Sequence, residues 1–76
     1  MADRKLLFAE LAELADAQRL VTLAEERMRA QKRLIAELDR DGKDSVNARE
    51  VLTALIQSHA GCVEKRDEIR EQLSFR

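Results

Sequence analysis

The 76-residue chain has no proline, tryptophan or tyrosine, and it contains only two glycines and two phenylalanines. Because proline and glycine mark most turns, their scarcity excludes a loop-rich or all-β fold. Cys62 is the only cysteine, so an intrachain disulfide is impossible, which fits a reducing compartment. No 18 apolar residues run together, and the first residues lack an apolar stretch of signal-peptide length. We therefore expect a cytoplasmic protein with no membrane contact.

Net charge is also nearly absent, since 14 basic residues stand against 15 acidic ones. This balance provides no bulk attraction to a nucleic-acid backbone, so nucleic acid is a disfavoured partner. A single domain is the most that this length allows, and so short a chain seldom encloses a catalytic cleft beside a core. Composition therefore points away from an enzyme.

Ala, Glu, Lys, Leu and Arg account for 45 of the 76 residues, a composition typical of long helices and coiled coils. Apolar residues recur at heptad spacing from Leu6 to Leu38 without a helix breaker before Gly42. We predict one helix over about 3–41, a turn at about 42–45 and a second helix over about 46–73. Gly42 can end the first helix in a left-handed conformation, and Asp44 or Ser45 can cap the second.

A short turn between two long helices predicts an all-α, antiparallel two-helix hairpin that resembles a coiled coil. Stacking outward from the turn pairs positions whose numbers add to 86 or 87, for example Ile35 with Leu52 and Leu14 with Leu73. The predicted contact line of helix two is Leu52, Leu55, His59, Cys62, Arg66, Ile69 and Leu73. On the same count, the residues before about Glu10 extend past the end of helix two.

Two helices share only one contact line, yet apolar residues flank that line on both of them. An isolated hairpin of this size is marginally stable, so we expect a homodimer that completes a four-helix bundle. An unidentified second protein is a further expected partner. The residues expected to make these contacts are Leu6, Leu7, Phe8, Leu20, Leu34, Val51, Ile56, Val63 and Phe75.

His59 and Cys62 are the one pair of residues that suggests a reactive or metal-binding site. They stand three residues apart on one helix face, so both side chains could reach one metal ion. Two ligands are too few for a closed site, and both residues fall on the expected contact line. A thiolate nucleophile would need a pocket, an oxyanion hole and an orienting group, none of which is indicated. We predict no catalytic residues, no metal site and no cofactor.

The second half of helix one is locally basic, and this supports an alternative function as a small nucleic-acid-associated regulator. On a helical wheel Arg29, Arg33 and Arg40 project away from the contact line, where they could bind phosphate. Glu25 and Glu37 stand four residues from Arg29 and Arg33, so they neutralise part of the run. Without aromatic stacking residues, a solvated helix face is the favoured interpretation.

The segment from Ala30 to Leu52 resembles a group of short α-proteobacterial proteins of unknown function. The shared pattern is Leu-Ile-Ala-x-Leu, an Asp-Gly-x-Asp-Ser/Thr turn, Ala-x-x-Leu-Leu and a late Arg-Asp. The matching positions are Leu34, Ile35, Ala36, Leu38, Asp41, Gly42, Asp44, Ser45, Ala48, Val51, Leu52, Arg66 and Asp67. Cys62 and Lys65 stand at places where that group tends to carry His. The resemblance implies a helical hairpin and brings no activity or ligand.

Overall fold

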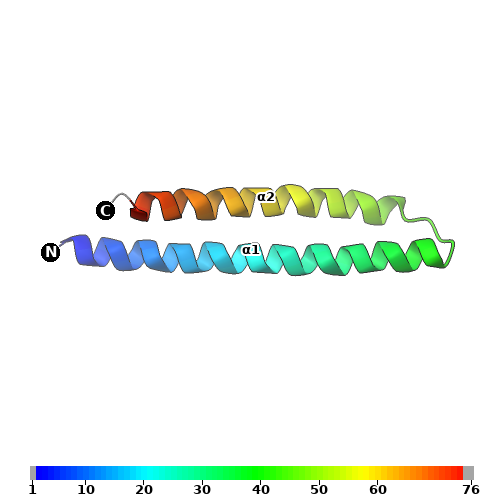
Figure 1. The fold of residues 1–76 in the computed structure, drawn as a ribbon, viewed down its shortest axis with the longest axis horizontal. Helices are drawn as coiled ribbons and strands as arrows, with labels where there is room; N and C mark the ends of the chain where they lie inside the picture. The colour runs from blue at the N-terminus through cyan, green and yellow to red at the C-terminus, as the bar shows by residue number, and fades with distance from the viewer. Residues whose placement is uncertain (1, 75–76) are drawn as a thin grey trace.

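The computed structural model describes residues 2–74 and the side chains of residues 7–74. Helix α1 spans Ala2–Arg40 and helix α2 spans Val46–Ser74. They lie side by side and antiparallel, as Figure 1 shows, and the molecule measures 63 × 14 × 13 Å. The predicted all-α hairpin is confirmed.

The contact line between the helices follows the predicted spacing. Ala17, Val21, Ala24 and Ile35 of α1 and Ile69 of α2 are each at most 8% exposed. The half-buried residues along the line are Glu10, Leu14, Met28, Gln31, Leu38, Ala48, Leu52, Leu55, His59, Cys62, Arg66 and Leu73. Heptad spacing keeps one stripe of each helix facing the other.

The turn begins with a helix end built on a left-handed residue. Gly42 has a φ of 68°, as predicted. The amide of Lys43 donates to the carbonyl of Leu38 (2.8 Å), and the amide of Gly42 donates to the carbonyl of Asp39 (3.2 Å). These two bonds form a Schellman motif, which satisfies carbonyls that the end of α1 would otherwise leave unpaired.

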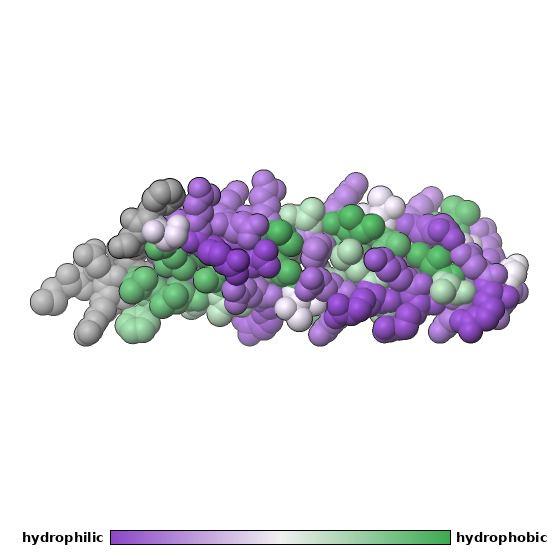
Figure 2. Space-filling model, viewed as in Figure 1, coloured by the Kyte–Doolittle hydropathy of each residue, from purple (hydrophilic) through white to green (hydrophobic). Residues whose placement is uncertain are grey.

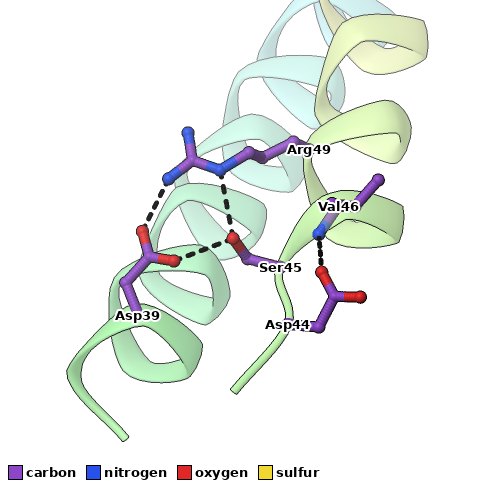
Figure 3. Close-up of polar contacts among 5 residues, drawn as sticks. All are labelled: Asp39, Asp44, Ser45, Val46 and Arg49. Carbon is purple, nitrogen blue, oxygen red and sulfur yellow. Dashed lines mark hydrogen bonds and ion pairs between the residues drawn. The ribbon is translucent and has the colours of Figure 1, made fainter. Parts of the chain in front are cut away.

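A polar cluster then fixes the start of α2 against the end of α1 (Figure 3). Asp44 accepts a hydrogen bond from the amide of Val46 (2.9 Å), so of the two predicted capping residues it is Asp44 whose side chain caps this amide. Ser45 instead donates its hydroxyl to Asp39 of α1 (2.8 Å) and accepts from Arg49 Nε (3.1 Å). Arg49 Nη2 also reaches the second oxygen of Asp39 at 2.6 Å. The three side chains link the two helices directly beside the turn.

We predict that Gly42→Val lowers the free energy of unfolding by about 1 kcal/mol or more, because a β-branched side chain is strained at positive φ. Gly42→Asn is the matched control, because asparagine tolerates the left-handed conformation better than a β-branched residue, and a Cβ at position 42 meets no atom within 4 Å. Its free energy of unfolding should stay closer to that of the parent chain. Urea unfolding followed by circular dichroism, at one fixed protein concentration, measures both changes. Equal midpoints for Gly42→Val and the parent chain would contradict this account of the turn.

Candidate interaction surfaces

The residues beside the contact line fall on two opposite long flanks of the hairpin. The Leu20 flank is the side formed by residues that stand directly before a contact-line residue in the sequence. Its defining residues are Leu20, Leu34, Val51 and Lys65, and the exposed residues next to them on that side belong to it too. Leu20 and Lys65 come from different helices and line one hollow of about 210 Å³, together with Ala17 and Ile69. Leu20 of α1 and Lys65 of α2 therefore lie on the same side of the hairpin.

The Leu20 flank exposes large apolar side chains. Leu20 is 55% exposed, Leu34 43% and Val51 48%. Leu23, which is 40% exposed, adds to them from the outer edge, although it is not among the contact residues expected from the sequence. Its spacing of three residues from Leu20 is the signal that points to it. Small exposed residues of this flank are Ala30, Ala54, Ser58 and Gly61, and charged ones include Glu13, Asp16 and Arg27.

The opposite flank, called the His59 flank, carries two contacts between a basic side chain and a carboxylate that join the helices. Arg49 lies 2.6 Å from Asp39, and His59 Nε2 lies 3.7 Å from Glu25 Oε2. Ile56 belongs to this side and is 45% exposed. Val63, from the same predicted set, is half-buried there. The candidate contact residues therefore do not form one surface, because Ile56 and Val63 face away from Leu20, Leu34 and Val51.

The open end of the hairpin forms a third apolar region. Helix α1 extends beyond α2 there, and hydrophobic atoms gather at this end of the molecule (Figures 1 and 2). Phe8 is 67% exposed, Leu11 45% and Leu7 40%. The predicted contacts of Leu6 and Phe75 lie outside the described side chains. Helix α1 extends past α2 at this end, as expected, and Leu11, three residues after Phe8, adds to the exposed apolar residues there.

His59 and Cys62 lie inside the contact line. His59 Nε2 is buried and makes no hydrogen bond, and it lies 3.7 Å from the Glu25 carboxylate. Cys62 is a half-buried free thiol. Within the described side chains, no three His, Cys, Asp or Glu residues are grouped so that they could hold a metal ion. Both side chains lie between the two helices.

The charges are distributed unevenly along the rod. Residues 27–59, the half that contains the turn, carry seven basic and five acidic side chains, a net charge of +2. The rest of the chain carries seven basic and ten acidic side chains, a net charge of −3. Arg29, Arg33 and Arg40 are all exposed on the turn half. An acidic hollow lies on the other half, lined partly by Glu64, Asp67, Glu68 and Glu71 of α2.

Comparison with protein-family models, curated proteins and solved structures finds no match for this chain. Neither helix, over the residues described, has the length of apolar sequence that a membrane crossing requires.

We predict that His59→Leu raises the free energy of unfolding by about 1 kcal/mol or more, because a buried nitrogen without a hydrogen bond is replaced by an apolar group. Gln31→Leu is the matched control at another polar position of the contact line. It should lower stability, since Gln31 Nε2 donates to the carbonyl of Ala48 (2.8 Å). Thermal melting of both variants at equal concentration makes the comparison. A lower melting temperature for His59→Leu would show that the imidazole stabilises the hairpin.

Proposed function

We propose that this protein is a non-catalytic, self-associating helical hairpin that acts as a protein–protein interaction module. The observation that carries the proposal is the excess of exposed surface. The chain exposes 6000 Å², whereas a compact protein of its 8.7 kDa mass exposes about 4,700 Å². The difference exceeds the ~800 Å² that each partner buries in an interface of standard size.

The kind of surface supports the same conclusion. Large apolar side chains on both flanks are 40% exposed or more, and burial of such surface is the main favourable term in association. Two hairpins packed through one flank would form a four-helix bundle, in which each helix contacts two neighbours. In this proposal the chain folds as a hairpin and becomes firmly stable as a dimer.

The open end is the second binding element of the proposal. Leu7, Phe8 and Leu11 are exposed near the end of α1 that extends beyond α2. Exposed apolar groups at this density mark interaction sites in soluble proteins. In the proposal this end docks a second protein, and the protein works by binding alone.

A nucleic-acid-associated regulator remains the alternative function. The observation that favours it is the exposure of Arg29, Arg33 and Arg40 on the half of the rod with net charge +2. Three exposed cations on one helix would give binding that falls steeply with salt. The rest of the rod has a net charge of −3 and would repel the same phosphates.

The self-association proposal is tested by sedimentation equilibrium of the parent chain between about 1 and 100 μM. We expect a mass above 8.7 kDa and a melting temperature that rises with concentration, since folding and association are linked. A mass of one chain over the whole range, with a constant melting temperature, would refute self-association.

The alternative is tested by binding of labelled duplex DNA and RNA at several salt concentrations. We expect weak binding that is lost when Arg29, Arg33 and Arg40 are all changed to Gln. Changing Arg19 to Gln, on the negatively charged half, is the control and should have little effect. Submicromolar affinity at physiological salt that requires the three arginines would make the alternative the better account.

A further inference from the structure

We propose that a second copy of this chain docks antiparallel on the Leu20 flank, about a two-fold axis at the level of Arg27 and Ser58. This inference rests on the proposed self-association and adds which surface is used, in which orientation and at which register. The turn of each hairpin then lies toward the open end of the other.

The order of residues along the flank has the symmetry that such an axis requires. On α1, Leu20 and Leu34 stand seven residues to either side of Arg27. On α2, Val51 and Lys65 stand seven residues to either side of Ser58. A two-fold axis that lies between the two copies, at the level of Arg27 and Ser58, pairs Leu20 of each copy with Leu34 of the other.

Positions 27 and 58 also lie near one level of the hairpin. Their numbers add to 85, close to the 84 of two cross-helix contacts, Ser45 with Asp39 and His59 with Glu25. One axis therefore serves both helices.

Gly61 supplies an independent observation. It lies within α2, where Gly costs about 1 kcal/mol relative to Ala, yet a Cβ there would meet nothing within 4 Å. No close contact inside the hairpin explains the glycine. A helix from outside that approaches closely would, because small residues let two backbones come near each other.

The neighbours of Gly61 extend this low surface along α2. Ala54 and Ser58 are exposed on the same side, at spacings of four and three residues. The proposed axis places Ala54 of one copy near Gly61 of the other, with the two Ser58 residues between them. Helix α2 would thus pack closely on its copy, while the leucines of the two α1 helices fill the space beside it.

Charge favours the antiparallel orientation over the parallel one. Antiparallel docking places the half with net charge −3 beside the half with +2 of the other copy, whereas parallel docking places like halves together. Arg27 lies near the axis, and its long side chain can extend the guanidinium to solvent while its stem covers apolar surface.

The other flank is less suited to a second copy. Its Asp39–Arg49 ion pair would have to be desolvated, as would the Glu25 carboxylate beside His59. The open end lies largely outside this interface, since an axis at Arg27 sets Leu7 and Phe8 of one copy past Arg40, the last residue of α1, in the other. A dimer through the Leu20 flank leaves both regions in solvent.

Disulfide trapping tests the axis. Ser58→Cys, made with Cys62→Ser, places one exposed thiol per chain at the proposed axis. Under oxidised glutathione we expect most of the chain to become a covalent dimer. Ala60→Cys in the same background is the matched control, because it is equally exposed, two residues away and on the opposite side of α2. It should cross-link at least tenfold more slowly.

Orientation is tested by mixing two chains of different mass, one with Val51→Cys and one with Lys65→Cys, both with Cys62→Ser. Antiparallel docking predicts the mixed 51–65 disulfide in excess over either symmetric one. A preference for 51–51 and 65–65 disulfides would refute the orientation.

Leu34→Ser tests the interface without cysteine. We expect it to raise the dimer dissociation constant measured by sedimentation tenfold or more, at unchanged helix content. Leu7→Ser should change the same constant less than twofold. A dimer that forms but cross-links through Ala60→Cys, or that depends on Leu7, would overturn this docking mode while leaving self-association intact. A chain that stays monomeric would overturn both.

Discussion

Two helices can share only one line of contact, and the other features of this molecule depend on that constraint. Each helix can bury a single stripe, so the described core is limited to Ala17, Val21, Ala24, Ile35 and Ile69. Every other apolar residue of the described chain stays at least partly in water. A third or fourth helix would cover them, and a second hairpin provides two. The shape of the fold thus creates the surfaces that we assign to binding.

The turn determines where those surfaces lie. A slip of one residue between the helices would move different side chains onto each flank, so register has consequences far from position 42. Asp39, Ser45 and Arg49 hold the register by linking the last turn of α1 to the first turn of α2. Arg49 and Asp39 are 58% and 46% exposed, and ion pairs of this kind contribute about 0–1 kcal/mol. The cluster thus contributes more to specificity of register than to stability.

Most of the fold could be predicted from the sequence, because heptad spacing and a single glycine in a polar segment leave few alternatives for a chain without proline. The roles of individual polar side chains could not be predicted from the sequence. Ser45 fits the preference for a capping residue, yet its hydroxyl bonds to Asp39 because α1 ends within reach. Pairing by sums of 86 or 87 sets Gln31 opposite Leu55, whereas its side chain bonds to the carbonyl of Ala48, seven residues nearer the turn. Such choices depend on torsion angles that spacing does not encode.

The candidate surface was harder to predict, for a geometric reason. A list of apolar residues outside the contact line does not record on which side of that line each one lies. Ile56 follows a contact-line residue and Val51 precedes one, and this difference alone puts them on opposite flanks. Leu23 directly precedes the contact-line residue Ala24, so the same rule assigns it to the Leu20 flank. Sorting residues by their order relative to the line recovers both flanks from the sequence.

The separation of the flanks has a functional consequence. In the proposed dimer Phe8 stays exposed, so association with a second copy and docking of another protein would not compete. An antiparallel dimer also places its two open ends at opposite ends of a rod that is longer than one hairpin, which measures 63 Å. Two bound partners would then be held apart at a fixed distance. A thin hairpin with one contact line is thereby suited to a spacer that carries a binding site at each end.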